Sequence, residues 1–433
     1  MNRYSSWALL GLTLAGAGLA ANACSATDET GTATTQAGVG GAGGAGGGTT
    51  TATGIGGSIS VGVAVGGGSC NGGTPADDKD GDGFSEDQND CNDCDEFVNP
   101  DAVEVVAEPG DGGTPEPTDE DCDGIKDNVA PPCDTGLVHN STDPMDAAKA
   151  IGLCKYVQQT TWVVADGSAA PVEATQLANF HKGHGNLPNL GPNNPPREGT
   201  TILALSSGIA RNAGDPDFTQ PSYVRNFPKG YTSNNPAGFP KESPSCPNSI
   251  TGVPNDATGI EFEVKAPSNA QGYSFDFNFF THEWPQYICK EFNDFFVAIM
   301  EPFPQGQTDG NISFDMLGNP ISVNNAFLDV CGCPSGPPCI VPPAMPVKSF
   351  DCASGTSGVV GTVFATDTTP GGAWSTGSSG WLRTSAPVTP GQVFKIRLVT
   401  YDSSDGNVDS TTLVDNFKWQ AKPGTVGTIV VPD

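Results

Sequence analysis

The densest group of carboxylates lies in "DDKDGDGFSEDQNDCNDCDEF" (77–97), which contains ten acidic residues and two cysteines. Carboxylates at this density repel one another unless a cation lies between them. Oxygen ligands of this kind select Ca²⁺ over softer metals. The stretch therefore predicts a calcium site.

The spacing of oxygens within this stretch follows that of a calcium loop. Positions 1, 3, 5 and 9 carry acids, position 7 offers a backbone carbonyl, and Gly83 at position 6 allows the sharp turn. The corresponding residues are Asp78, Asp80, Asp82, Glu86 and the carbonyl of Phe84. Asn89 replaces the bidentate Glu of an EF-hand, and Gly/Pro-rich sequence precedes the loop. We therefore expect a calcium loop without the helices of an EF-hand.

A second acidic run, "DEDCDGIKDN" (119–128), follows "DCNDCDEFVNPDAVE" (90–104). The order DxDGDG, DCxDxD, NPxAxE and DxDCDGxxD resembles the MopE-type acidic metal-binding repeat, a relative of thrombospondin type 3 repeats, over residues 77–128. The resemblance implies that Cys91 and Cys122 pair, leaving Cys94 another partner. It also implies calcium held by both runs, on Asp78, Asp80, Asp82, Glu86, Asp90, Asp93, Asp121, Asp123 and Asp127. The alternative is an unstructured acidic linker.

The N-terminus predicts export. Residues 1–23 have a short basic start, an apolar stretch and small residues, as a signal peptide does. "Ala-Asn-Ala" suits ordinary cleavage, whereas Cys24 directly after it resembles a lipobox. Lipidation of Cys24 would leave an even 12 of the 13 cysteines for disulfides. We expect a cell-surface or outer-membrane lipoprotein, or a secreted protein if Cys24 is not lipidated.

Composition divides the chain further. Residues 24–69 are Gly/Ala/Thr-rich and predict a disordered tether. Residues 70–134 form the acidic module; between Asp77 and Asp134, 21 acids and 2 bases give −19 of the total charge of −30. Such charge disfavours nucleic acid and anionic lipid as partners, so we expect membrane contact only through a lipid on Cys24.

Residues 135–421 carry the apolar patterns of a large folded domain, followed by a tail at 422–433. Eight segments predict strands, and several of them alternate in and out, for example Tyr273, Phe275, Phe277 and Phe279 on one face of a strand. Residues 143–157 alone predict a helix. The sequence therefore predicts a mainly β domain, a β-sandwich of jelly-roll kind.

Three stretches of this domain resemble the choice-of-anchor L family of surface proteins. They are "FDFNFFTHEWPQYICKEFNDFFVAIM" (275–300), "GTTILALSSGIAR" (199–211) and "TPGQVFKIRLVTYDSSDGNVDSTTLVDNF" (389–417). The resemblance spans most of residues 140–420 and implies a surface protein without enzymatic activity.

Polar residues at the strand ends of this domain leave two interpretations open. A second calcium site would use Glu283, Asn293, Asp294, Asp402, Asp405 and Asp409. The simpler interpretation is turn chemistry, because Asp and Asn bond their own backbone in tight loops. We expect "HKGH" (181–184) to be a surface loop, since no carboxylate is near it in the sequence.

The leading functional hypothesis is a surface-tethered, calcium-stabilised binding or adhesion protein that takes a glycan or a protein ligand. The alternative is a secreted carbohydrate-active hydrolase that pairs Glu283 with a second carboxylate. A third is a mainly structural coat component. The motifs of serine hydrolases, zinc proteases and phosphate-binding loops are missing from the sequence.

Overall fold

The computed structural model describes residues 70, 72–105, 117–128, 130–220, 225–324, 327–328, 330–332, 354–365 and 376–432. The predicted signal peptide and the predicted tether (residues 24–69, with Cys24) lie outside these ranges. Among the described residues, no helix has the length and apolar character needed to cross a bilayer.

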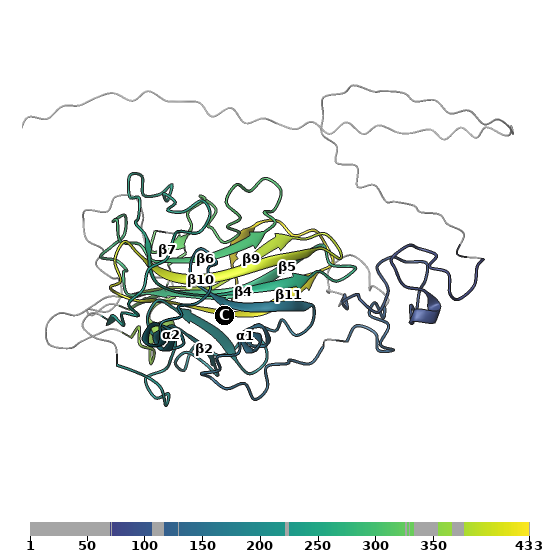
Figure 1. The fold of residues 1–433 in the computed structure, drawn as a ribbon, viewed down its shortest axis with the longest axis horizontal. Helices are drawn as coiled ribbons and strands as arrows, with labels where there is room; N and C mark the ends of the chain where they lie inside the picture. Colours follow the sequence, from purple (N-terminus) through teal and green to yellow (C-terminus); the bar gives the residue numbers. More distant parts are fainter. Residues whose placement is uncertain are drawn as a thin grey trace, which may run out of the picture. The chain divides into compact units, whose positions relative to one another are not determined.

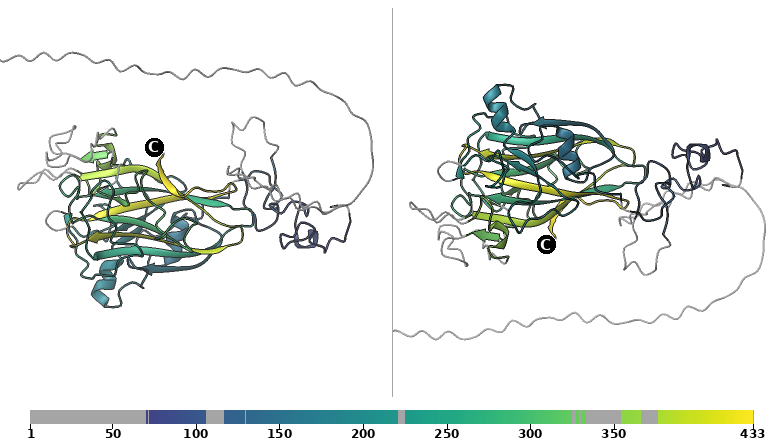
Figure 2. Two further views of the ribbon diagram at one scale, coloured as in Figure 1. Left: turned by 90° about the horizontal axis from the view of Figure 1, so that it is seen from above. Right: turned by 90° about the horizontal axis from the view of Figure 1, so that it is seen from below.

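Two antiparallel sheets form the β-domain, which confirms the predicted β-sandwich (Figure 1). The first sheet is ordered β1 (Val157–Val163), β4 (Pro254–Lys265), β10 (Val393–Ser403), β6 (Phe295–Glu301) and β7 (Ile321–Ser322). The second is ordered β12 (Gly427–Val430), β9 (Thr376–Pro387), β5 (Gly272–Thr281), β11 (Ser410–Gln420), β3 (Ile202–Ser206) and β2 (His184–Leu187), with β8 (Val330–Gly332) paired to β9. The long strands of both sheets lie roughly along one common axis in the two views of Figure 2, with neighbouring strands antiparallel. All eight predicted strands are present.

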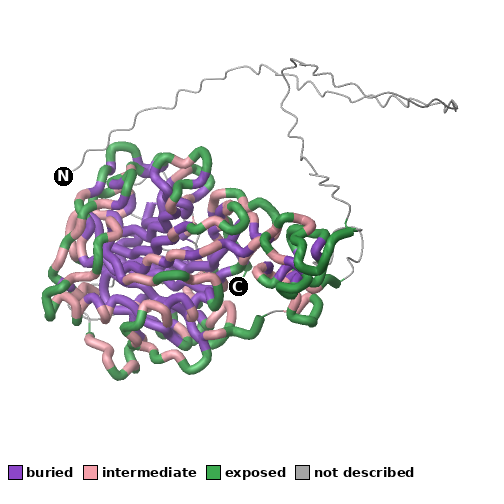
Figure 3. Tube along the Cα trace, turned by 45° about the vertical axis from the view of Figure 1, so that its right-hand side comes forward, coloured by how far each residue is buried: buried purple, intermediate pink, exposed green. Residues whose placement is uncertain are grey.

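The main core lies between the sheets, and β5 supplies much of it. Tyr273, Phe275, Phe277 and Phe279 all belong to this core and are at most 1% exposed. Burying each of these rings stabilises the fold by roughly 2–3 kcal/mol. Phe280 points the other way, into a second apolar cluster. The larger sheet is therefore covered on both faces. In Figure 3 buried residues (purple) fill the interior of the β-domain.

A buried ion pair occupies the second face of β5. Asp276 is fully buried and accepts hydrogen bonds from Arg383 Nε at 2.6 Å and Arg383 Nη2 at 3.0 Å. Arg197 Nε lies 3.4 Å away, and Asn416 Nδ2 donates at 2.8 Å. Because a buried carboxylate must be paired, these partners fix the contacts between β5, β9 and β11.

The predicted helix is shorter than expected. Helix α1 (Pro144–Ala150) begins where Asp143 accepts a hydrogen bond from the Met145 N–H at 2.9 Å. It ends before Gly152, whose φ of 85° breaks the helical path. Helix α2 (Ala174–Phe180) was not predicted, because its cap is Glu173, an unusual residue at that position. Single 3₁₀ turns occur at η1 (Glu86–Gln88) and η3 (Ser357–Val359).

The end of the chain adds to the sandwich. Residues 427–430 of the expected tail pair with β9 as strand β12, and Val431 packs into the second apolar cluster. The β-domain thus continues beyond residue 421. A strand of four residues is too short for its apolar alternation to be recognised in the sequence.

Four disulfides have both partners among the described residues. The Cys91–Cys122 bond confirms the pairing that the repeat resemblance implied, and Cys94 pairs with Cys70. The other two are Cys133–Cys154 and Cys246–Cys289. The acidic module has almost no hydrophobic core, since its buried apolar side chains among the described residues are Val98 and Ala102.

Candidate metal centres

The first acidic loop is folded by carboxylates that accept hydrogen bonds from its own backbone. Asp78 Oδ1 accepts from the N–H of Gly81 at 2.7 Å, and its Oδ2 accepts from Gly83 at 3.0 Å. Asp82 Oδ1 accepts from Phe84 at 2.8 Å. Gly83 has a φ of 100°, which an ordinary side chain would strain. The loop therefore curls around its carboxylates.

The second acidic loop repeats this arrangement. Asp119 accepts from the N–H of Asp123 at 3.1 Å and of Gly124 at 3.0 Å. Asp123 Oδ1 accepts from Ile125 at 2.8 Å, as Asp82 does from Phe84 in the first loop. The two loops are local structural repeats.

Among the described residues, carboxylates converge in four overlapping groups, each with one oxygen per member within 4.8 Å of the others. The groups are Asp78, Asp80 and Asp93; Asp80, Asp82 and Asp90; Glu104, Glu120 and Asp127; and Glu104, Asp119 and Asp121. The first two share Asp80 and the last two share Glu104. We name them the Asp80 centre and the Glu104 centre.

Both centres contain oxygens that a cation would satisfy. Asp80 Oδ2, Asp90 Oδ2 and Glu104 Oε2 are buried and have no hydrogen-bond partner. Leaving such an atom buried and unpaired costs about 1–3 kcal/mol, more when the group is charged. Since every side chain in these groups offers a carboxylate oxygen, the donor set fits Ca²⁺.

Electrostatics in the Asp80 centre also favours a cation. Burial raises the pKa of Asp80 to about 6 and raises the pKa of Asp90. Lys79 Nζ lies 2.7 Å from Glu86 and 2.9 Å from Asp93, and these hydrogen bonds raise its pKa. One lysine offsets part of the negative charge, and a cation bound here would compete with it for Asp93.

The predicted ligands divide into two classes. The residues that enter the centres are Asp78, Asp80, Asp82, Asp90, Asp93, Asp121 and Asp127. Glu86 instead pairs with Lys79, and Asp123 Oδ2 accepts from Asn128 Nδ2 at 2.7 Å. The backbone N–H of Phe84 donates to Asp82 Oδ1, which places Phe84 within the first loop.

Sequence reasoning missed three members of the Glu104 centre: Glu104, Asp119 and Glu120. Aligning the two acidic runs would have found Asp119, which takes the place of Asp78. Glu104 is the acid of the "NPDAVE" turn. Its Oε1 accepts from the Asp121 N–H at 3.4 Å, so the turn folds back on the second loop.

Strand ends of both sheets meet at one end of the β-domain. Thr281, the last residue of β5, pairs with Ser410, the first of β11. Phe295, the first of β6, pairs with Tyr401 near the end of β10. The residues just outside these four strand ends are therefore brought together, although they are far apart in sequence.

Five of the six residues predicted for a second calcium site are buried at this end: Glu283, Asn293, Asp294, Asp402 and Asp409. The Asp294 N–H donates to Glu283 Oε2 at 2.7 Å, and Ser410 Oγ donates to Asp294 Oδ2 at 2.6 Å. Asp409 accepts from the Phe227 N–H at 2.9 Å. Only Asp405 behaves as a turn residue, half-buried and accepting from the Asn407 N–H at 3.3 Å.

Burial dominates the electrostatics of these acids. It raises the pKa of Glu283 and that of Asp409 to about 8 each. The pKa values of Asp294 and Asp402 are raised well above their usual range, by burial first and by neighbouring carboxylates second. This end of the sandwich therefore requires protons or a cation to offset its charge.

The β-domain matches a known protein family. A family model of the choice-of-anchor L domain matches residues 154–417, more than half of the chain. The chain belongs to the choice-of-anchor L family. No curated protein and no solved structure gives a match. Membership in this family confirms the resemblance that the sequence of the β-domain predicted. It also indicates an exported, surface-associated protein.

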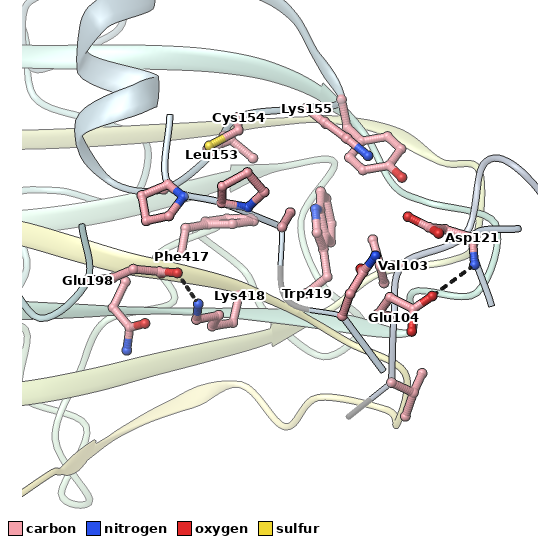
Figure 4. Close-up of a pocket in the computed structure, with 18 of the residues that line it drawn as sticks. Val103, Glu104, Asp121, Leu153, Cys154, Lys155, Glu198, Phe417, Lys418 and Trp419 are labelled. Atoms are coloured by element: carbon pink, nitrogen blue, oxygen red, sulfur yellow. Dashed lines mark hydrogen bonds and ion pairs between the residues drawn. The ribbon is translucent and has the colours of Figure 1, made fainter. Parts of the chain in front are cut away.

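A pocket of about 620 Å³ opens beside the Glu104 centre of this choice-of-anchor L protein (Figure 4). The acidic module contributes Glu104 and Asp121, while the β-domain contributes Tyr156, Lys418 and Trp419. The rings of Tyr156 and Trp419 meet edge to face, with centroids 6.0 Å apart. Aromatic surface flanked by charged groups is typical of a site for a polar organic ligand.

The choice-of-anchor L domain does not present Glu283 as a hydrolase would. Glu283 is 2% exposed, and it does not line the pocket. A glycosidase acid must reach the glycosidic oxygen of its substrate. The family is not an enzyme family, which also favours a non-enzymatic role.

The prediction for "HKGH" was wrong at His184. This residue belongs to β2, is 1% exposed and stacks on Trp162 with ring centroids 3.7 Å apart. His181 Nδ1 lies 2.8 Å from its Nε2. Pairing of β2 with β3 places the ring in the core, which the Gly-rich sequence around it does not reveal.

Proposed function

We propose that this protein is a surface-tethered, non-enzymatic binding protein whose β-sandwich takes a glycan in the pocket beside a calcium-stabilised acidic module. The observation that carries the proposal is the sharing of Glu104 and Asp121 between the Glu104 centre and the pocket wall. Calcium bound there would fix one wall of the ligand site.

Direct hydrogen bonds between the module and the β-domain support this coupling. The N–H of Val103 donates to Asn269 Oδ1 at 2.9 Å, and Asn269 Nδ2 donates back to the Val103 carbonyl at 2.7 Å. Lys265 Nζ lies 2.7 Å from Asp101. The backbone next to Glu104 is thereby attached to the loop between β4 and β5.

The pocket chemistry favours a glycan. Tyr156 and Trp419 offer aromatic faces on which the apolar face of a sugar ring can stack. Lys155, Lys418 and Glu198 offer hydrogen-bonding groups for hydroxyls, and Lys418 Nζ is paired with Glu198. A protein ligand is the competing outcome of the test.

Two further parts of the proposal rest on sequence. The resemblance of residues 77–128 to MopE-type repeats supports calcium as the cation of both centres. The lipobox-like Cys24 supports a lipid anchor, with residues 24–69 as the tether. For this class of loop in a secreted protein we expect a dissociation constant on the order of 10⁻⁴–10⁻³ M.

A glycan array probed with the full chain tests the function. We expect binding in about 5 mM calcium, which is on the order of ten times the expected dissociation constant. We expect glycan binding to be lost in EDTA. Trp419→Ala removes the stacking surface and should abolish binding in calcium. Glu104→Gln should weaken binding at least about tenfold in calcium, because the wall loses its charge and its cation.

Asp87→Asn is the matched control, since Asp87 is an exposed acid of the same module outside both centres. Its glycan binding should equal that of the unmodified chain. Binding that survives both EDTA and Trp419→Ala would disprove the pocket as the ligand site. An array without signal, with binding to a surface protein instead, would replace the glycan by a protein ligand.

A further inference from the structure

The two acidic loops of the module match position by position. Asp78 and Asp119 each accept a hydrogen bond from the N–H of the glycine five residues later. At the third position of each loop an acid accepts from the N–H two residues on, and at the fifth an acid accepts from an asparagine amide. These acids are Asp80 and Asp121 at the third position, and Asp82 and Asp123 at the fifth.

The second position breaks this correspondence. The first loop has Lys79 there, whereas the second loop has Glu120. Lys79 Nζ lies 2.7 Å from Glu86 and 2.9 Å from Asp93, which is a member of the Asp80 centre. Glu120 is itself a member of the Glu104 centre. The same loop position therefore supplies a cation to one centre and a carboxylate to the other.

Lys79 takes both oxygens of Asp93. The Lys79 backbone N–H donates to Asp93 Oδ1 at 2.8 Å, and the ammonium of the same residue lies against Oδ2. Asp93 is 4% exposed, so its carboxylate has little room to turn away. Oδ2 is thus the oxygen that calcium would use, and calcium can bind it only if the ammonium moves aside.

Other oxygens of the Asp80 centre still lack a partner. Asp90 is 4% exposed, and its Oδ2 is buried without a hydrogen bond, as is Oδ2 of Asp80. Each centre contains five carboxylates. With Lys79 included, the formal charge of the Asp80 centre is −5 + 1 = −4, against −5 for the five carboxylates of the Glu104 centre. Lys79 therefore offsets part of the charge without satisfying the whole centre.

We propose that the Lys79 ammonium is a tethered competitor of calcium, so that calcium fills the Glu104 centre before it fills the Asp80 centre. This inference rests on the proposed function, which makes calcium the cation of both centres. A hydrogen bond between charged groups is worth a factor of about ten or more in an equilibrium constant. We therefore expect the Asp80 centre to need at least about ten times more calcium.

The order of filling has a consequence for the ligand site. Glu104 and Asp121 belong to the centre that fills first, and both line the pocket beside Trp419. The pocket wall is therefore completed at a calcium concentration that leaves Lys79 in place in the first loop. Filling of the Asp80 centre follows at higher calcium, and its residues are not among those that line the pocket.

Hydrogen exchange in the full chain follows each loop separately. Peptides covering 77–90 and 117–128 report the two loops during a calcium titration from about 10⁻⁵ to 10⁻² M, which brackets the expected dissociation constants. The midpoint is the calcium concentration that gives half of the protection. The first loop should have a midpoint at least about tenfold higher than the second. Equal midpoints, or a lower one for the first loop, would overturn the proposal.

Lys79→Met distinguishes a competitor from a merely structural lysine. In EDTA the first loop of this variant should exchange faster, because its carboxylates have lost their internal cation. In calcium the midpoint of the first loop should fall about tenfold, to near that of the second loop. A lysine that only stabilises the loop would give a higher midpoint after its removal, and that result would refute competition.

The reciprocal change tests the same position in the second loop. Glu120→Lys should raise the midpoint of that loop more than Glu120→Gln does, because the lysine adds a competitor as well as removing a carboxylate. Lys126→Met is the matched control, since Lys126 is an exposed lysine of the second loop. It should shift either midpoint by less than about threefold, as expected for a surface charge.

The outcomes separate this inference from the function on which it rests. If calcium protects neither loop, calcium is not the cation of these centres, and both proposals fail in that respect. If calcium protects both loops at one midpoint that Lys79→Met does not change, only the competition is disproved. Glycan binding in the pocket would then still be supported by its own test.

Discussion

Acidic residues are handled in opposite ways in the two regions of this molecule. In the acidic module most carboxylates remain at least partly exposed, and a lysine, two disulfides and short turns surround them. In the β-domain the acids of the strand ends and of β5 are buried. Water can stabilise the first kind of charge, but the second kind needs a specific partner.

Asp276 shows what a satisfied buried acid looks like. Two arginines and Asn416 surround its carboxylate, whereas Asp402 at the end of the sandwich has a hydroxyl partner, Ser207, in place of an arginine. The same chain thus contains a buried acid paired with protein cations and another that lacks them.

The largest expected effect comes from breaking the satisfied pair. Asp276→Ala leaves Arg383 and Arg197 without their carboxylate and should lower the free energy of unfolding by about 3 kcal/mol or more. Urea unfolding followed by tryptophan fluorescence measures it. Asp87→Ala, at an exposed module acid, should change the value by less than about 0.5 kcal/mol. Equal effects at both positions would contradict the contrast between the regions.

Removing a disulfide tests whether the module is held without a core. Cys91→Ser with Cys122→Ser opens a loop of sequence separation 31 and should destabilise the module by about 2–3 kcal/mol. Hydrogen exchange of amides in residues 72–105 should accelerate, while the melting temperature of the β-domain stays unchanged.

The control for this prediction is Cys246→Ser with Cys289→Ser, which lies in the β-domain. That variant should lower the melting temperature of the β-domain and leave exchange in the module unaltered. If loss of the Cys91–Cys122 bond lowered the melting temperature of the β-domain as much as loss of Cys246–Cys289 does, the two regions would unfold as one unit.

The long strands could be predicted from sequence because their apolar residues alternate over seven or more positions, as in β5. Strands β2 and β12 could not, since four residues carry too little pattern and their place depends on pairing with β3 and β9. The same limit explains His184, whose burial follows from its partner strand rather than from its neighbours.

The candidate sites were predictable to the extent that spacing along the chain determines them. Asp78, Asp80 and Asp82 lie in one loop, so their regular spacing was sufficient to predict them. Glu104 joins its centre only because a turn folds back on the second loop. In the β-domain, spacing could not tell Asp402 from Asp405, because burial depends on the pairing of β10 with β6, about 100 residues earlier in the chain.

The smallest expected effect is a pH dependence in the β-domain. Asp415 is 1% exposed, and burial raises its pKa to about 7, although three backbone N–H groups favour its charged form. Between pH 4 and pH 7 the folded state therefore keeps a proton that the unfolded state has lost. This proton stabilises the fold at the acidic end, and the stabilisation is lost as the pH rises through 7.

Asp415→Asn stays neutral at every pH, so its free energy of unfolding should fall by about 1–2 kcal/mol less than that of the unmodified chain between pH 4 and pH 7. Urea unfolding in EDTA at several pH values measures this slope. Asp87→Asn, in the module, should leave the slope unchanged because its carboxylate is exposed in the folded chain. If the two variants had equal slopes, burial would not distinguish the acids of the β-domain from those of the module. The two regions would then differ only in how densely acids follow one another along the sequence.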